Sequence, residues 1–322
     1  MKVLVTGGAG FIGSHLVEDF QDKAEVIVLD NFRTGHRKNL AGLKCEIVEG
    51  SILDRELLSR ITPGTDCIFH LAALVSVPES MTRLSETVDI NVQGLLNVLE
   101  SGKMHGVRKL CFASSAAVYG ENPGQPKVET MAPDPRSPYG ITKLDGEFYC
   151  ALYARENWIE TAALRFFNVF GPRQDPMGSY AGAVPIFIRN ALANQAITIF
   201  GDGGQTRDFI YVKDVVGALS FLAQSNGVTG VYNAGYGQST SIADLACTIL
   251  EEAGSTSQIV HAPERAGDIR HSQSSPRKLM DAGWKPTHGV ANGLKETIRS
   301  FSSGRAADPV AASPTHPELH HL

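Results

Sequence analysis

The chain has 322 residues, of which 43% are hydrophobic and 20% are charged, and this balance excludes a largely disordered protein. The length suffices for a large core, built either as one α/β unit or as two domains that share an interface. A formal net charge of −5 without a basic run gives no electrostatic sign of a nucleic-acid partner. No apolar run reaches bilayer length and the first residues are expected to form a core strand rather than a signal peptide, so we expect a cytoplasmic protein without a membrane partner.

The cysteines lie in apolar segments and show no CxxC spacing. This pattern predicts buried thiols in a reducing compartment, and it favours neither a metal site nor a disulfide framework. The five residues are Cys45, Cys67, Cys111, Cys150 and Cys247.

The first thirteen residues, MKVLVTGGAGFIG, predict a buried strand that feeds a helix through a tight turn. The strand is expected at Lys2–Thr6 and the helix at Phe11–Phe20. Gly7, Gly10 and Gly13 permit a positive φ, a close approach of a pyrophosphate and close packing of the helix on the strand. Because the free N–H groups at a helix start attract anions, the stretch predicts a phosphate site.

Spaced glycines alone are also what any tight strand-to-helix turn needs, so the next strand matters. The apolar run Glu25–Leu29 ends in Asp30, near the position where a carboxylate accepts hydrogen bonds from the adenosine ribose of NAD. An acid there repels the 2′-phosphate of NADP. Arg33 and Arg37 follow and argue for NADP, but Asp30 stands at the strand end itself, and NAD is the cofactor we predict.

Short apolar strands continue to alternate with helical stretches at Cys45–Gly50, Asp66–Ala72 and Lys109–Ser115. Such alternation predicts a Rossmann-type, doubly wound parallel sheet with helices on both faces. Ligands in this architecture lie beyond the carboxyl ends of the strands. The segments to inspect are therefore His70–Ser76, Ser114–Tyr119 and Phe166–Asn168.

Two longer helices and a further strand follow. Leu84–His105 reads as one helix, with Asn91 in its middle expected to bond backbone groups of a neighbouring loop. A second helix is expected at about Tyr139–Glu156, and a strand at Thr161–Arg165.

The composition changes after this strand, where a smaller C-terminal α/β lobe that binds substrate is expected. We assign 1–167 to the NAD-binding domain, to which the chain returns at about 207–235 through a strand and helix at Phe209–Ala223 and a strand at Val231–Ala234. The lobe is expected to comprise 168–206 and 236–302, and 303–322 is expected to be a flexible tail. Within the lobe, Ser241 and Asp244 resemble a helix N-cap with an acid in the first turn.

Tyr139 and Lys143 lie four residues apart at the start of a helix, so both project from one face. A free tyrosine has a pKa of about 10, and a nearby cation favours its phenolate form. Ser115 ends a predicted strand and can hydrogen-bond the same substrate oxygen, although Ser114 beside it competes for this role. The three side chains are candidates for a catalytic set.

Together these residues resemble the extended short-chain dehydrogenase/reductase superfamily, and within it the nucleotide-sugar 4-epimerases similar to UDP-glucose 4-epimerase. The resemblance covers about Met1 to Ile298. It is carried by VTGGAGFIGSHL, Asp30, HLAA, Asn91, SSAAVYG, SPYGITK, LRFFNVFGPRQ and TRDFIYVKDV.

The resemblance implies a mechanism. The Tyr139 phenolate takes the proton of the sugar 4-hydroxyl, and hydride passes from C4 to tightly held NAD. The 4-keto sugar then rotates to present its other face before the hydride returns. It also implies a homodimer formed through the helices that hold Asn91 and Tyr139.

The cofactor-binding positions implied by the resemblance follow the strand ends. Ser51 departs from the family, because relatives carry an Asp there for the adenine, and Val75 replaces a Lys of some relatives. The implied positions are Gly7, Gly10, Phe11, Ile12, Gly13, Asp30, Asn31, Ser51, Ile52, Leu71, Ala72, Ala73, Asn91, Ser114, Tyr139 and Lys143.

For the UDP-sugar, the resemblance maps Asn168 to the diphosphate, Arg207 and Arg265 to the pyrophosphate charges, Asp268 to the uridine ribose and Phe200 to the uracil. Arg265 and Asp268, three residues apart, are also spaced for a simple surface ion pair. The full substrate-binding set is Ser76, Ser115, Ala116, Ala117, Tyr139, Asn168, Ala183, Val184, Thr198, Phe200, Arg207, Arg265, Asp268 and Ser272.

Two features of the sequence indicate which reaction is catalysed and which sugar is used. Ala116 and Ala117 stand where related dehydratases carry an Asp-Glu pair and decarboxylases a Glu, so epimerisation remains. Ser272 stands where glucose/galactose-restricted relatives tend to carry a Tyr, which leaves room for an N-acetyl group. UDP-GlcNAc and UDP-GalNAc are therefore the expected substrates, with UDP-Glc and UDP-Gal as further ones. The alternatives are a UDP-glucuronate 4-epimerase and a non-catalytic NAD-binding sensor or scaffold.

Overall fold

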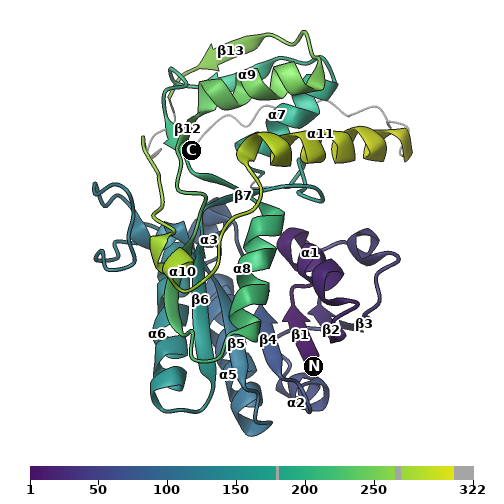
Figure 1. The fold of residues 1–322 in the computed structure, drawn as a ribbon, viewed down its shortest axis with the longest axis vertical. Helices are drawn as coiled ribbons and strands as arrows, with labels where there is room; N and C mark the ends of the chain where they lie inside the picture. Colours follow the sequence, from purple (N-terminus) through teal and green to yellow (C-terminus); the bar gives the residue numbers. More distant parts are fainter. Residues whose placement is uncertain (179–180, 265–269, 308–322) are drawn as a thin grey trace.

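The computed structural model describes residues 1–178, 181–264 and 270–307. Seven strands form one sheet in the order β11-β6-β5-β4-β1-β2-β3, and every neighbouring pair is parallel. The prediction of a Rossmann-type sheet is confirmed (Figure 1). The strands are β1 (Lys2–Thr6), β2 (Glu25–Asp30), β3 (Glu46–Glu49), β4 (Cys67–His70), β5 (Lys109–Ser115), β6 (Glu160–Phe166) and β11 (Gly230–Ala234).

Helices cover both faces of this sheet. Val3 and Val5 of β1 belong to the core under α1 (Phe11–Phe20) and α8 (Val212–Gln224). Leu4, between them, points into the opposite core. That second core is formed with α2 (Arg55–Ile61), α5 (Gly94–Met104) and α6 (Pro138–Arg155). The alternation follows from the two-residue period of a strand, and it makes the sheet doubly wound.

The predicted helix Leu84–His105 consists of three parts. These are α4 (Leu84–Val88), a π-helical turn η2 (Asp89–Gln93) and α5. Asn91 lies in the π-helical turn, where its side chain accepts a hydrogen bond from Leu74 N (2.7 Å) and donates one to Leu74 O (3.0 Å). The expectation that Asn91 bonds a neighbouring loop is confirmed.

The C-terminal elements gather beyond the carboxyl ends of the sheet strands (Figure 1). Three helices and two of the three two-stranded sheets share a separate apolar core, and the third sheet consists of polar residues. Ser241 caps one helix: its Oγ accepts a bond from Asp244 N (2.9 Å), which confirms the predicted N-cap. The elements are α7 (Ala183–Leu192), α9 (Ile242–Ala253) and α11 (Val290–Ala307), with the sheets β7 (Asn168–Phe170) with β10 (Phe209–Tyr211), β8 (Ile197–Phe200) with β13 (Ile259–Ala262), and β9 (Thr206–Arg207) with β12 (Thr240–Ser241).

Four short helical elements complete the described chain. They are η1 (Arg37–Leu40), α3 (Val77–Thr82), η3 (Ala116–Tyr119) and α10 (Arg277–Asp281).

The cysteines partly contradict the sequence analysis. Cys67, Cys111 and Cys150 are buried, but Cys45 is half-buried and Cys247 is exposed. Cys247 lies on the outer side of the amphipathic helix α9, so the prediction of burial is wrong there. Within the described residues no group of three His, Cys, Asp or Glu side chains is placed to hold a metal. In the same part of the chain, no helix combines the length and the apolar character that a membrane crossing requires.

Candidate active site

The glycine-rich turn between β1 and α1 has no room for side chains. Gly7 has a φ of +74°, and a Cβ there would lie 2.7 Å from Ala72 N. A Cβ on Gly13 would lie 2.2 Å from Gly7 O, so α1 packs directly on the turn. The first N–H groups of α1 have no partner in their own helix, as at any helix start. The bare backbone and the helix start fit a pyrophosphate, as expected for a dinucleotide cofactor.

Asp30 ends β2 and is tied to the same turn. Its carboxylate accepts hydrogen bonds from Ala9 N (2.9 Å) and from Phe32 N (2.8 Å). Asp30 therefore shapes the glycine-rich turn, a role that the sequence analysis missed. The neighbouring arginines are engaged elsewhere: Arg33 pairs with Glu79 (2.7 Å) and Glu86 (2.5 Å), and Arg37 pairs with Glu49.

The other candidate cofactor positions also follow strand ends. Leu71, Ala72 and Ala73 come directly after β4, and Ser51 and Ile52 come shortly after β3. The Ser51 hydroxyl accepts a bond from Leu53 N (3.1 Å). The carbonyl of Ile52 accepts one from the Asn97 amide (3.2 Å), so both of these cofactor candidates also bond groups of the protein.

Tyr139 and Lys143 lie in the first turns of α6. Ser137 caps this helix by accepting a bond from Gly140 N (3.1 Å), and Pro138 occupies the first position. The ammonium of Lys143 donates to Ala113 O (2.7 Å) and lies 5.7 Å from the centre of the Tyr139 ring. The predicted common face of the two side chains is thus observed.

The electrostatic setting of Lys143 depends on burial. The side chain is almost fully buried, and loss of hydration lowers the pKa of Lys143 to about 8. His70 lies nearby and bonds Thr6 Oγ1 through Nδ1 (2.9 Å). Burial, together with the charge of Lys143, lowers the pKa of His70 to about 3, so this imidazole is neutral at physiological pH. Lys143 therefore supplies the positive charge beside Tyr139.

The two serines at the end of β5 differ in their surroundings. Ser114 is buried, and its hydroxyl donates a 2.5 Å hydrogen bond to Glu147. Ser115 is half-buried, and its hydroxyl oxygen accepts a bond from Ala117 N (3.1 Å), which leaves its proton available for another acceptor. This arrangement favours Ser115 as the partner of Tyr139.

The candidate substrate residues come from several elements. Asn168 in β7 donates from its side-chain amide to Asp208 O (3.2 Å). Arg207 in β9 donates to Thr206 O (2.9 Å) as one of its contacts. Ser272 donates its N–H to Thr206 O (3.1 Å), so residues 206–208 connect three of the candidates.

The remaining candidates are placed as follows. Ala183 and Val184 begin α7, Ser76 caps α3, and Phe200 ends β8, which also carries the exposed Thr198. Arg265 and Asp268 lie outside the described residues.

A comparison with known protein families identifies the family of the chain. Residues 3–235 match the model of the NAD dependent epimerase/dehydratase family. The chain belongs to this family. It is an enzyme whose cofactor is NAD, and the glycine-rich turn and Asp30 are the features that fit this cofactor.

Known members resemble the chain over almost its whole length. A putative UDP-glucose 4-epimerase of Methanocaldococcus jannaschii is 40% identical over 299 residues, which are 92% of this chain and 97% of that protein. The structure of a UDP-N-acetylglucosamine 4-epimerase of Methanobrevibacter ruminantium with UDP-N-acetylmuramic acid has a TM-score of 0.91, with 37% identity and coverage of 94% and 98%. A Thermus thermophilus UDP-glucose 4-epimerase with NAD has a TM-score of 0.86, with 39% identity and coverage of 94% and 99%.

Next to the candidate catalytic residues, the structure contains a buried ion pair that the sequence analysis missed. Arg165 of β6 donates two bonds to Glu147 of α6, of 2.8 and 2.7 Å. The Arg165 guanidinium also lies 4.6 Å from the centre of the Tyr119 ring, whose hydroxyl donates to Asn233 (2.6 Å). With Ser114, these contacts fix α6 to the carboxyl ends of β5 and β6, and they fix Tyr119 of η3 to β11.

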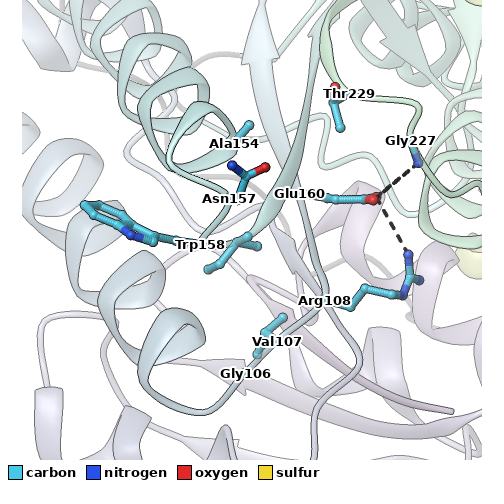
Figure 2. A pocket seen from close by; sticks show the side chains of 10 residues that line it. Gly106, Val107, Arg108, Ala154, Asn157, Trp158, Glu160, Gly227 and Thr229 are labelled. Carbon is cyan, nitrogen blue, oxygen red and sulfur yellow. Dashed lines mark hydrogen bonds and ion pairs between the residues drawn. The ribbon is translucent and has the colours of Figure 1, made fainter.

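A pocket of about 580 Å³ lies at the opposite end of the sheet, where the strands have their amino ends (Figure 2). Its lining includes Arg108, Glu160 and Thr229, which lie at or just before the amino ends of β5, β6 and β11. Figure 2 shows Glu160 between Arg108 and the backbone of Gly227. Because ligands of doubly wound sheets bind at the opposite strand ends, this pocket is separate from the candidate active site.

Proposed function

We propose that the enzyme interconverts the C4 epimers of UDP-sugars, with UDP-GlcNAc and UDP-GalNAc as substrates and UDP-Glc and UDP-Gal as further ones. The observation that carries the reaction type is the side-by-side placement of Tyr139 and a buried, positively charged Lys143 at the carboxyl edge of the sheet. The relatives named UDP-glucose and UDP-N-acetylglucosamine 4-epimerase support the same reaction.

The residues divide the chemistry among them. Lys143 favours the phenolate of Tyr139, which takes the proton from the sugar 4-hydroxyl. Ser115 donates its hydroxyl proton to the same sugar oxygen and orients it. The glycine-rich turn and Asp30 would hold NAD, which would supply reversible hydride transfer at C4, with return to the opposite face of the sugar. Tyr139 then gives the proton back, so no net oxidation occurs.

The segment after Ser115 argues against elimination or decarboxylation. Ala116 and Ala117 form the start of η3 and bring no carboxyl group to the sugar. Removal of water or carbon dioxide from a 4-keto sugar requires a further acid or base. Without one, the 4-keto sugar can only be reduced again, which gives the epimer.

The sugar preference rests on Ser272. Its small side chain is half-buried beside β9, next to the segment that carries Arg207. A serine leaves space for an acetamido group at C2 that a tyrosine would fill.

A homodimer accompanies this proposal. α4 packs beside α6, and both helices expose large apolar side chains within the described chain. These are Leu84, Val88, Ile141 and Phe148. Pairing the two helices with those of a second copy would bury the four side chains.

The test is incubation of the purified enzyme with UDP-GlcNAc, UDP-Glc and UDP-glucuronate in parallel, with separation of the products. Conversion of UDP-GlcNAc to UDP-GalNAc is expected. Conversion of UDP-glucuronate alone would favour the glucuronate 4-epimerase. Bound NAD without conversion of any sugar would favour a non-catalytic sensor.

A further inference from the structure

Ser272 lies in a segment whose backbone is hydrogen-bonded to other parts of the chain on both sides. On one edge, Ser272 N donates to Thr206 O (3.1 Å). On the other edge, Lys127 N donates to Gln273 O (2.8 Å) and Ser275 N donates to Lys127 O (2.8 Å). Lys127 belongs to the long loop between η3 and α6, so this loop and β9 flank the segment together.

The side chain of Gln125 extends this pairing to Ser272 itself. Gln125 Nε2 donates to His271 O (2.8 Å), and Gln125 Oε1 accepts from Gln273 N (3.1 Å). These are the two backbone groups on either side of Ser272. A neighbouring parallel strand uses the same two groups of a strand, so the carboxamide replaces one residue of a strand opposite Ser272. Two bonds in a fixed geometry restrain both the position and the tilt of this backbone.

A buried anchor lies two residues further along the chain. Asp208 Oδ2 accepts bonds from Ser274 N (2.9 Å) and Ser274 Oγ (2.5 Å). Asp208 is fully buried, so removing its carboxylate would leave these donors unpaired in the core. Gln125 is exposed, and its bonds restrain the segment from the surface. The hydrogen bonds of Gln125 can therefore be removed without leaving an unpaired group in the core.

We propose that Gln125 is a positioning residue for sugar specificity, acting through the backbone on both sides of Ser272. This inference rests on the proposed function, because it assumes that Ser272 faces the C2 substituent of the sugar. The loop that carries Gln125 begins at η3, directly after Ser115. One loop thus connects the end of the catalytic strand to the position that selects the sugar.

The test compares Gln125→Ala and Gln125→Glu with wild type, using kcat/KM for UDP-GlcNAc and for UDP-Glc. Gln125→Glu keeps an acceptor for Gln273 N but places a carboxylate against His271 O. The matched control is Asn122→Ala, because among the described residues the side chain of Asn122 bonds only groups of its own loop, Gly124 N (3.0 Å) and Ala132 O (3.3 Å). Both Gln125 variants are expected to lose about three- to tenfold in kcat/KM for UDP-GlcNAc, about the effect of losing one or two hydrogen bonds, and less than about twofold for UDP-Glc.

Amide hydrogen exchange of the 270–276 segment supplies a reading that does not depend on turnover. In Gln125→Ala the N–H of Gln273 loses its acceptor, and faster exchange is expected there than in Asn122→Ala. The inference would be overturned if the Gln125 variants left the ratio of kcat/KM for the two sugars unchanged, or if Asn122→Ala changed this ratio equally. In either case, activity of the wild type would leave the proposed function standing. A wild type that converts neither sugar would overturn both.

Discussion

The ammonium of Lys143 donates a 2.7 Å hydrogen bond to the carbonyl oxygen of Ala113, two residues before Ser115. This contact draws the lysine of α6 onto the end of β5 and places its charge beside Tyr139. A buried ammonium at this point has few ways to be stabilised, so its pKa falls. The helix, the strand end and the cation form the framework on which the candidate chemistry depends.

Replacing Tyr139 with Phe removes the acid/base group while keeping the ring. We expect kcat to fall by about 10²–10⁴, the usual contribution of a positioned proton-transfer group. The amount of NAD that copurifies should remain close to that of wild type. An initial-rate assay with UDP-GlcNAc and UDP-Glc measures the first quantity, and extraction of the cofactor measures the second. A rate near that of wild type would exclude Tyr139 as the base.

The pH dependence of the rate should report Lys143. Below a pKa of about 8 the ammonium is charged and favours the Tyr139 phenolate, and above this value the charge is lost. We therefore expect kcat to decline as the pH rises through about 7.5 to 9.5. Lys143→Arg keeps its charge over this range, so the decline should be absent even if the rate is lower throughout. The same decline in Lys143→Arg would assign it to another group.

Enlarging Ser272 should close the space that the proposed N-acetyl group needs. For Ser272→Tyr we expect a loss of at least about tenfold in kcat/KM for UDP-GlcNAc and a much smaller change for UDP-Glc. Ser272→Ala is the matched control, because it keeps the space and should keep the ratio. An unchanged ratio in Ser272→Tyr would count against the pocket-size argument.

The Glu147–Arg165 pair should behave as a buried ion pair. Glu147→Gln leaves the Arg165 charge uncompensated, and we expect the free energy of unfolding to fall by about 3–5 kcal/mol. Replacing both residues with Met removes the stranded charge and should cost less than the single change. Urea unfolding measures both variants. A loss below about 1 kcal/mol for Glu147→Gln would mean that water reaches the pair.

The apolar face of α4 and α6 predicts the oligomeric state. Light scattering should give a mass of about twice the 34.6 kDa chain. Phe148→Glu places a charge at the centre of the exposed face and should produce monomers that still bind NAD. Glu251→Lys, on the exposed side of α9 and away from α4 and α6, is the control for a surface charge. A monomeric wild type would contradict the proposed dimer.

The sheet could be predicted from the sequence because most of its strands are buried on both faces and read as short apolar runs. The bounds of β1, α1 and β5 agree with the predicted ones. The short strands of the C-terminal part, such as β9 and β12, have two residues each and pair across long separations, so no local pattern marks them. Cys247 was misplaced because its helix is apolar on one side only.

The side-chain contacts of the site were less accessible to sequence analysis. The Glu147–Arg165 pair joins residues that are far apart in the chain, and a helix glutamate usually faces solvent. Gln125 lies in a loop and acts by bonding the backbone of a segment almost 150 residues away. Such contacts depend on tertiary structure. Ser115, Tyr139 and Lys143 were accessible because their positions at a strand end and a helix start carry a local pattern.

In the proposed reaction, the hydrogen at C4 leaves the sugar and returns to the same carbon without exchanging with water. The most direct measurement is epimerisation of UDP-GlcNAc labelled with deuterium at C4, with the product analysed by mass spectrometry and NMR. We expect the UDP-GalNAc formed to retain the deuterium at C4. Replacement of the label by hydrogen from the solvent would show that C4 is deprotonated instead, and would contradict hydride transfer.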